Sequence, residues 1–426
     1  MLKRLNLVLA IICVCISMSA QEKIALSLEE AKEYAYEHNR SIQNASIDIQ
    51  VAERSKWQTL ATMLPQISAS FDYLSYCGYS MELMGISIPM NPSGTFGATA
   101  AVALSGSQVV GTIINDIAID MSNISLDKTK QSIEASVTKL YVSALAMEKT
   151  INLLKLSLAN IESLYEMTTN SVKVGVAEQT DADKLSVQVA SLQNSIKATE
   201  RSIEMLYNSL RLQLGTPVDC EITLTDSLDI MTSEEATINL LSKSFELDNN
   251  YDYQLLKKNL DMSDMQIKLT VMDYLPKVSA YYQYSAKTYF GQDEGMNMTP
   301  PNMVGISFSL PIWSSGQRTT KLQSAKLNNK ISQNTFLDTK DALLVQDRQL
   351  RFNLSSAYES FEIQNKNIEV SQRVFDNISN KYEYGRASSL EVTNANTDLI
   401  SAQSNYIQAL LELVNAQIEL QTLINE

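Results

Sequence analysis

The chain has 426 residues, with 34 Lys and Arg against 48 Asp and Glu, so its formal net charge is −14 at pH 7. Such an acidic chain does not suit nucleic acid, because phosphates are bound chiefly by Lys and Arg. A single histidine, His38, excludes histidine-based nucleophile–base pairs and histidine-rich metal sites. We therefore expect no catalytic residue, no cofactor, no metal and no nucleic-acid partner, and we interpret the chain as not an enzyme.

The first twenty residues have the layout of a secretory signal peptide. Lys3 and Arg4 begin it, an apolar stretch follows at 5–16, and small residues precede Gln21. That stretch is too short to span a membrane, which takes about 20 apolar residues. Cys13 lies inside the stretch rather than just after it, so we expect no N-terminal lipid anchor. Because we expect no other long apolar helix, insertion into a membrane would require a closed β-barrel.

The remaining chain is a tandem repeat with a spacing of about 210 residues. Pro65 returns as Pro276, and Gly175 returns as Gly385. The spacing changes in the stretches 77–95, 288–302 and about 106–115, and we expect loops there because insertions and deletions collect in loops. We expect a first structural repeat at 21–213, an equatorial linker segment at 214–248 with a short strand at 222–224, and a second structural repeat at 249–426.

Each repeat contains two segments in which apolar and polar residues alternate. In the first segment Phe71 and Tyr73 alternate with Ser70 and Asp72. A period of two is typical of half-buried strands, and transmembrane barrels are built from strands of about ten residues with one apolar face. An ordinary soluble sheet with one wet face is the alternative. We expect strands at about 66–76, 95–105, 277–287 and 303–310.

The alternation gives the expected sheet two different faces. We expect the apolar face to contact lipid and the polar face to line a water-filled interior. Aromatic side chains near the strand ends are expected to form interfacial girdles. The lipid-facing set contains Phe71, Tyr73, Tyr282 and Phe308, the water-facing set contains Asp72, Gln283 and Ser307, and the girdles contain Tyr76, Tyr79, Tyr289, Phe290 and Trp313.

The longest segments have the pattern of coiled-coil helices. The whole chain has 13 glycines and 8 prolines, which suits long uninterrupted helices. Ile133, Val137 and Leu140 begin an apolar run with alternating four- and three-residue spacing that continues to Ile161. Such a run is the a/d seam of a coiled coil, and a helix of some 65 residues is about 100 Å long. We expect a mainly α fold with β, with long antiparallel helices at about 107–173, 178–213, 316–382 and 388–425.

Four strands in each chain cannot close a barrel, since the smallest transmembrane barrels have eight. Two copies would give eight strands, whose interior is filled by side chains, while three copies would give twelve and leave a pore. Polar residues such as Ser68, Ser70 and Asp72 favour a wet interior. We therefore expect a homotrimer with a twelve-stranded transmembrane β-barrel.

Several short segments mark the helix–strand junctions and the turns between the long helices. They are 26–31 (LSLEEA), 64–68 (LPQIS), 174–181 (VGVAEQTD), 214–217 (LGTP), 309–313 (SLPIW) and 382–392 (YEYGRASSLEV). In their order and repetition they resemble the TolC family, across essentially the whole mature chain. The resemblance implies a trimeric outer-membrane channel whose long α-helical barrel extends into the periplasm. It also implies a periplasmic adaptor protein and an inner-membrane transporter as partners.

The resemblance also assigns roles to the two turns between long helices. In the family these turns close the tunnel through a few polar contacts and carboxylate rings, and the adaptor docks on them. This chain departs at two places: Ala387 stands where some members have a basic residue, and Asn394 where they have a second carboxylate. The implied gate residues are Thr180, Asp181, Tyr382 and Glu391, and the implied docking tips are Gly175, Val176, Gly385 and Arg386.

Two interpretations of these gate residues stay open. Tyr382 can donate a phenolic hydrogen bond, and ionised Asp181 can only accept one, so the pair could hold the turns closed. Alternatively, Thr180, Asp181 and Ser388 are helix caps, since acidic and hydroxyl side chains stabilise helix N-termini. The two interpretations are compatible.

We expect the chain to be the passive exit duct of a tripartite efflux system for small molecules. One alternative is the exit duct of a type I protein secretion system, because substrate choice lies largely in the pump. The other alternative is a periplasmic structural coiled-coil protein that does not enter the membrane, against which the alternating strands argue.

Overall fold

The computed structural model describes residues 23–228, 234–290 and 300–425, so the expected signal peptide at 1–20 lies outside the described residues. The chain is mainly helical and divides into two compact units, which we describe separately. The first unit contains residues 1–45, 126–251 and 341–426, and the second contains residues 46–125 and 252–340.

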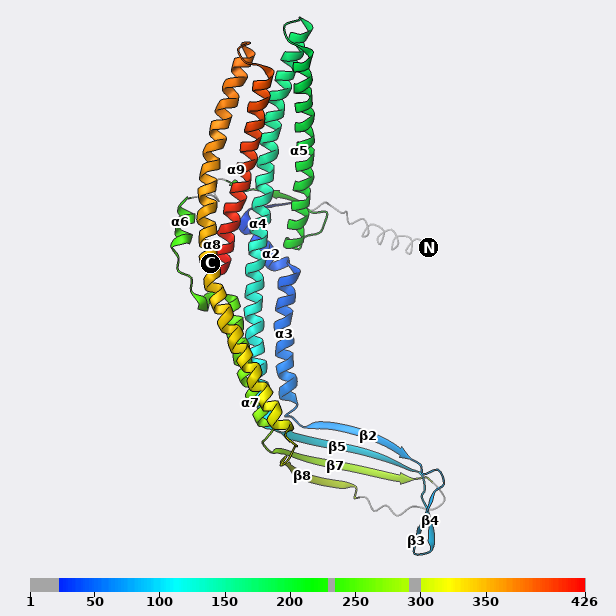
Figure 1. The fold of residues 1–426 in the computed structure, drawn as a ribbon. Helices are drawn as coiled ribbons and strands as arrows, with labels where there is room; N and C mark the ends of the chain where they lie inside the picture. The colour runs from blue at the N-terminus through cyan, green and yellow to red at the C-terminus, as the bar shows by residue number, and fades with distance from the viewer. Residues whose placement is uncertain (1–22, 229–233, 291–299, 426) are drawn as a thin grey trace, which may run out of the picture. The chain divides into compact units, whose positions relative to one another are not determined.

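Long helices make most of the first unit (Figure 1). Their apolar seam residues recur with heptad spacing, which packs one helix against the next as in a coiled coil. Val137, Leu185, Leu354 and Leu413 come from four different helices and are almost fully buried. The helices are the C-terminal parts of α4 (Gly106–Lys173) and α8 (Gln317–Glu383), together with α5 (Gln179–Leu214) and α9 (Ser389–Ile424).

Short elements pack against these helices. Strands β1 (Lys23–Leu26) and β6 (Glu221–Leu224) form a parallel pair, which confirms the short strand that the sequence indicates at 222–224. The hydroxyl of the buried Tyr141 lies 2.9 Å from the carbonyl oxygen of Leu26 and 3.1 Å from a carboxylate oxygen of Asp226. The unit also contains α2 (Leu28–His38), the start of α3 (Arg40–Ala61), α6 (Glu234–Ser242) and the 3-10 helix η2 (Leu247–Asn249).

The two repeats use asparagine at the same joint. The side-chain amide of Asn39 donates to the carbonyl of Gln213 (2.6 Å), and its oxygen accepts from the N–H of Ser41 (2.8 Å). Asn250, its counterpart, donates to the carbonyl of Leu423 (2.9 Å). Each asparagine therefore joins the start of one helix to the C-terminal end of another, α5 in the first repeat and α9 in the second.

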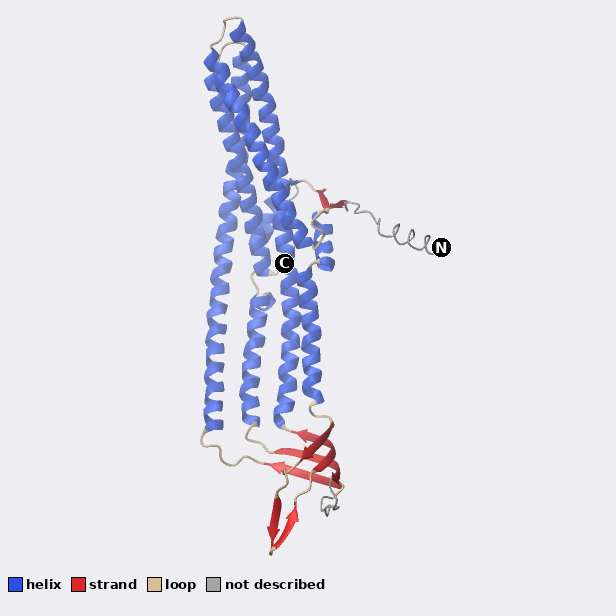
Figure 2. Cartoon of the chain, turned by 90° about the vertical axis from the view of Figure 1, so that its right-hand side faces the viewer, coloured by secondary structure: helices blue, strands red, loops and turns tan. Residues whose placement is uncertain are grey.

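The second unit contains a four-stranded antiparallel sheet with the strand order β2-β5-β7-β8, drawn in red in Figure 2. Within the described residues, the two edge strands β2 and β8 each pair on one side only. The strands are β2 (Gln66–Leu74), β5 (Ser93–Leu104), β7 (Lys277–Tyr289) and β8 (Asn302–Ser309), and helices of this unit include most of α3 and α7 (Tyr251–Met272).

The strand register separates the side chains into the two expected groups. Residues that are directly opposite across strands share a face, and faces alternate along each strand. The register groups Phe71, Tyr73, Tyr282 and Phe308 on one face and Asp72, Gln283 and Ser307 on the other. The apolar face is largely uncovered in the single chain, with Ile67, Val304 and Ile306 all strongly exposed.

Tyr281, which breaks the sequence alternation, lies on the polar face opposite Gly305. A Cβ added to Gly305 would lie 2.5 Å from the Tyr281 ring, so the ring covers the glycine. Aromatic cover of a strand glycine protects backbone that would otherwise be bare. The packing of this pair accounts for the break in the pattern.

Three expectations from the sequence are wrong. The stretch near 106–115, expected as a loop, is the start of α4. The stretch at 77–95, also expected as a loop, contains a hairpin of β3 (Ser80–Leu83) and β4 (Ile86–Pro89), whose turn has positive φ at Met84 and Gly85. Such paired positive φ angles match the twist of a two-residue hairpin.

The expectation of no further long apolar helix also fails. By length and composition alone, α4 is long and apolar enough to cross a membrane. Exposed apolar residues of this helix, such as Val109 and Ile113, lie outside the expected seam.

Candidate functional site

The turn between α4 and α5 is built on a left-handed glycine. Gly175 has φ of 77°, its N–H donates to the carbonyl of Val172 (3.0 Å), and the N–H of Val176 donates to the carbonyl of Ser171 (2.9 Å). This pair of bonds around one left-handed residue is a Schellman motif, which ends a helix. Glycine is favoured there because it has no Cβ.

The turn between α8 and α9 repeats the same geometry. Gly385 has φ of 67°, its N–H donates to the carbonyl of Tyr382 (2.9 Å), and the N–H of Arg386 donates to the carbonyl of Lys381 (2.7 Å). Both glycines that the sequence assigns to the docking tips therefore have a structural reason to be glycine. Their docking role stays a prediction.

Exposed side chains gather on both turns. Val176 is 82% exposed and Tyr384 is 79% exposed, and Val174 and Arg386 are exposed as well. The Arg386 side chain makes no hydrogen bond or ion pair with any residue that the structure describes. We call Val174, Val176, Tyr384 and Arg386 the tip patch, which combines exposed apolar area with a cation.

Asp181, in the first turn of α5, is bonded across to the other hairpin. Its carboxylate accepts a hydrogen bond from the hydroxyl of Ser389 (2.5 Å), the first residue of α9, and Lys184 lies 3.8 Å away. Thr180 is exposed, and its hydroxyl donates to the carboxylate of Glu178 (3.1 Å). Asp181 thus joins α5 to α9, whereas Thr180 makes a contact within its own turn.

Tyr382, near the end of α8, hydrogen-bonds Thr168 on α4. The Thr168 hydroxyl has one proton, which it donates to the carbonyl of Leu164 (2.8 Å). The phenol of Tyr382 must therefore donate to Thr168. Within one chain Tyr382 and Asp181 are not bonded to each other, since each has a partner on the opposite hairpin.

Glu391 makes a helix cap. Its carboxylate accepts from the backbone N–H of Ser388 (2.7 Å) and from the Ser388 hydroxyl (2.9 Å), while that hydroxyl accepts from the N–H of Glu391 (3.3 Å). This reciprocal arrangement is a capping box. The hydrogen bond from the backbone N–H of Ser388 and, to a smaller extent, the bond from its hydroxyl hold the pKa of Glu391 below its usual value. At the two positions where this chain departs from the family pattern, Ala387 is half-buried and Asn394 is exposed.

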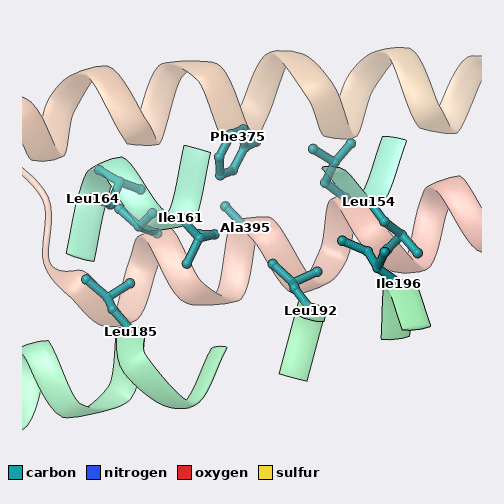
Figure 3. Packing of buried hydrophobic residues seen from close by; sticks show 10 residues of the cluster. Leu154, Ile161, Leu164, Leu185, Leu192, Ile196, Phe375 and Ala395 are labelled. Carbon is teal, nitrogen blue, oxygen red and sulfur yellow. The ribbon is translucent and has the colours of Figure 1, made fainter. Parts of the chain in front are cut away.

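A cluster of buried apolar side chains, which we call the tip core, lies next to the two interhairpin bonds. All four helices contribute to it (Figure 3), and Tyr382 packs against it. A dry, close-packed cluster of this kind holds the helices in one arrangement. It contains Leu154, Ile161 and Leu164 of α4, Leu185, Leu192 and Ile196 of α5, Phe375 of α8, and Val392, Ala395 and Leu399 of α9.

Sequence reasoning missed Thr168 and Ser389 as bonding partners. One signal was present, because Thr168 lies seven residues after Ile161 and so continues the apolar seam as a polar residue. A polar residue at a seam position needs a partner when it is buried. Ser389 gave no comparable signal, since a serine beside a helix start is an ordinary helix-end residue.

The family model of outer membrane efflux proteins matches this chain twice, at residues 33–216 and 244–426. The double match confirms the tandem repeat. The chain is 21% identical over 417 residues to the outer membrane protein TolC of Salmonella enteritidis, covering 94% of this chain and 82% of that protein. It is 22% identical over 305 residues to the probable efflux pump outer membrane protein TtgC of Pseudomonas putida, covering 68% and 60%.

Solved structures share the fold. The outer membrane protein VceC of Vibrio cholerae superposes with a TM-score of 0.74 at 14% identity, covering 93% of this chain and 95% of VceC. CusC superposes with a TM-score of 0.77 at 15% identity, covering 93% and 91%. Because the family model covers most of the chain in two successive matches, the protein belongs to the outer membrane efflux protein family and is an outer-membrane efflux channel.

Proposed function

We propose that three copies of this chain form the exit duct of a tripartite efflux system. In this proposal the duct is a passive conduit, and a periplasmic adaptor protein joins it to an inner-membrane transporter. The chain consists of two repeats at 21–213 and 249–426 and an equatorial linker at 214–248. The observation that carries the proposal is the four-stranded sheet, which has two open edges and one uncovered apolar face.

The sheet supports a homotrimer in outer-membrane lipid. An open sheet edge leaves backbone N–H and C=O groups unpaired, which lipid does not tolerate. Pairing β2 of one copy with β8 of the next satisfies these groups, and three copies give twelve strands. The apolar face of the sheet then contacts lipid, and Asp72, Gln283 and Ser307 line the pore.

The gate is proposed to be formed by Thr180, Asp181, Tyr382 and Glu391 at the two turns. Two bonds support this assignment, since Tyr382 donates to Thr168 and Asp181 accepts from Ser389. Both bonds join one hairpin to the other, so breaking them frees the hairpins to separate. Glu391 contributes by capping α9 and fixing the start of that helix.

The tips are proposed to bind the adaptor through Gly175, Val176, Gly385 and Arg386. The exposed tip patch supports this role, because exposed apolar side chains beside a cation are typical of a protein–protein contact. The glycines contribute by setting the turn that presents Val176 and Arg386.

Small molecules are the proposed cargo. The relatives include a toluene efflux pump outer membrane protein and an antibiotic efflux pump outer membrane protein from Pseudomonas putida. No observation on this chain favours protein secretion. A periplasmic coiled-coil protein that avoids the membrane is disfavoured, because it would leave the apolar sheet face in water.

Bilayer recording tests the proposed function. Purified protein should insert into planar bilayers and give discrete conductance steps, and after cell fractionation it should be in the outer membrane. A variant with Phe308→Arg on the apolar face should insert poorly, whereas Ser307→Arg on the polar face should insert normally, which provides a matched control. Protein released with the soluble periplasm, or without any conductance, would contradict the proposal.

A further inference from the structure

Helix α9 has polar residues at buried positions of its coiled-coil seam. Taken at intervals of seven, six residues form one stripe along the helix, which we call the a stripe. The intervening seam residues are apolar throughout, whereas four of the six in the a stripe are polar. The a stripe contains Ser389, Asn396, Gln403, Leu410, Gln417 and Ile424, and the intervening residues are Val392, Leu399, Tyr406, Leu413 and Leu420.

Two members of the a stripe are buried without partners. Asn396 is 0% exposed, and neither its amide nitrogen nor its oxygen has a hydrogen-bond partner among the residues that the structure describes. Gln403 is 6% exposed, and its side-chain oxygen likewise lacks a partner there. Val392 and Leu399, on either side of Asn396 in the seam, belong to the apolar tip core. Both amides are thus buried at a cost, because water is withdrawn and no bond replaces it.

The first repeat does not have this feature. The positions equivalent to Asn396 and Gln403 are Ser186 and Gln193 on α5, and both are exposed. The Gln193 amide donates to the carboxylate of Glu162 (3.3 Å). Helix α9 is buried over far more of its length than α5, so polar residues that are solvated in one repeat are enclosed in the other.

We infer that Asn396 and Gln403 are positioning residues of the gate, which weaken the packing of α9 so that the hairpin of α8 and α9 can separate from the hairpin of α4 and α5. In the packed arrangement the Asn396 amide and the Gln403 side-chain oxygen lack partners, while separation exposes them to tunnel water. Each unsatisfied amide shifts such an equilibrium toward the separated form by roughly tenfold. The inference rests on the proposed function, because it assumes that the turns of these hairpins are the gate.

The shift toward separated hairpins that the amides cause opposes the hydrogen bonds between the hairpins. The bonds of Tyr382 to Thr168 and of Ser389 to Asp181 hold the hairpins together at the turns. The partnerless amides lie further along α9 and favour separation. The amides narrow the free-energy gap between the closed and the open form, so a docking protein needs less differential affinity to open the gate.

Replacing both amides by leucine tests the inference. Asn396→Leu together with Gln403→Leu gives these positions the residue that Leu410 already supplies in the a stripe. Open-state occupancy in planar bilayers should fall about tenfold or more, while the thermal unfolding midpoint should hold or rise. Unchanged occupancy, or a lower midpoint with a more open channel, would overturn the inference by showing that the amides stabilise the packed form.

Gln417→Leu is the matched control. Gln417 belongs to the same stripe and is 8% exposed, but its amide donates to the hydroxyl of Thr237 (2.9 Å). Its replacement should leave open-state occupancy at the parent level. If Gln417→Leu closes the channel as strongly as the double variant, added apolar volume is the cause and the inference fails.

A second variant, Asn396→Asp, tests the inference through the pH dependence of channel opening. Asn396→Asp buries a carboxyl group, which costs more when ionised than when protonated. The channel of this variant should be more open at neutral than at acidic pH, and the parent should not share this dependence. A pH-independent variant would contradict the inference. If the parent itself shows no conductance, the proposed function fails instead, so the two failures are distinguishable.

Discussion

At the scale of residues, two polar bonds connect the helical hairpins near their turns. The phenol of Tyr382 donates to Thr168, and the carboxylate of Asp181 accepts from Ser389. A net contribution of about 1 kcal/mol is typical for a neutral hydrogen bond, and about 1.5–3 kcal/mol for a bond to a charged group. In a trimer each bond would be present three times, which would keep an open arrangement rare.

Removing both bonds should open the gate. Tyr382→Phe with Asp181→Ala deletes the donor of one bond and the acceptor of the other, without changing the apolar seams. Single-channel conductance should rise and larger solutes should enter, while circular dichroism should show unchanged helix content. Tyr384→Phe is the control, because that exposed phenol makes no hydrogen bond with any residue that the structure describes. Parent-like conductance in the double variant would show that closure is held elsewhere.

The capping box of α9 predicts a pH dependence. Since Ser388 holds the pKa of Glu391 below its usual value, the ionised cap stabilises the folded chain at any pH above that usual value. The stabilisation is lost as the pH falls through the lowered pKa. Hydrogen-exchange protection at the start of α9, corrected for the intrinsic exchange rate at each pH, should therefore fall in acid by more in the parent than in Glu391→Gln. Equal acid sensitivity of the parent and of Glu391→Gln would show that the ionised cap does not stabilise α9.

The sequence indicated Asp181 and Tyr382 but not the residues that they contact. Repetition and family resemblance place a residue at a turn, which suffices to propose four gate positions but not their bonding partners. Pairing depends on which helices are neighbours and on how far each is rotated, and neither follows from a heptad pattern alone. Thr168 was the exception that a polar seam position could have revealed.

At the scale of elements, three of the long helices, α4, α5 and α8, are each followed by a glycine with a left-handed backbone conformation. Gly175, Gly215 and Gly385 have φ between 67° and 78°. Their surroundings differ, however. A Cβ at Gly175 or Gly385 would meet nothing within 4 Å, whereas a Cβ at Gly215 would lie 2.3 Å from the carbonyl oxygen of His38. Gly215 is thus required by packing as well as by backbone conformation.

Alanine substitution should separate the requirement of backbone conformation from the requirement of packing at these glycines. Gly175→Ala introduces only the left-handed backbone penalty, roughly 1 kcal/mol, and should fold normally. Gly215→Ala adds a backbone collision and should cost several kcal/mol, as overpacked sites do. Thermal unfolding should show a small shift for the first and a large shift or loss of trimer for the second. Equal shifts would contradict the packing at the joint of α2 with α5.

The two faces of the sheet predict opposite chemical accessibility. In a background with Cys77→Ser, a cysteine at position 72 should react with a water-soluble thiol reagent, and a cysteine at position 73 should not. Arginine on the lipid face near the midplane should cost roughly 2–4 kcal/mol, and much less on the pore face. Labelling at 73 but not at 72 would reverse the assignment of the faces.

The elements with a strong period were predictable, and the others were not. The a/d seam of α4 and the alternation of β2 each repeat a physical constraint many times. The β3–β4 hairpin has four-residue strands, too short for alternation to stand out from a loop. Its signal was Met84–Gly85 between apolar residues, but a methionine with φ of 55° is unusual in such a turn.

At the scale of the whole molecule, the single chain leaves unsatisfied surfaces. The sheet has two edges without neighbours in the described residues, and its apolar face is exposed. Both features are explained if copies of the chain pair edge to edge in a membrane, since closure removes the edges and lipid covers the apolar face. The charge pattern and the family could be recognised from sequence, but the number of copies follows only from strand count and pore polarity.

The most direct test of this account is the mass of the protein in mild detergent. Multi-angle light scattering, with the detergent contribution subtracted, should give three copies of the mature chain in one particle. That result would match twelve strands enclosing a pore with Asp72, Gln283 and Ser307 on its wall. A stable monomer or dimer would contradict the account, because four or eight strands of this sequence could not enclose an open channel.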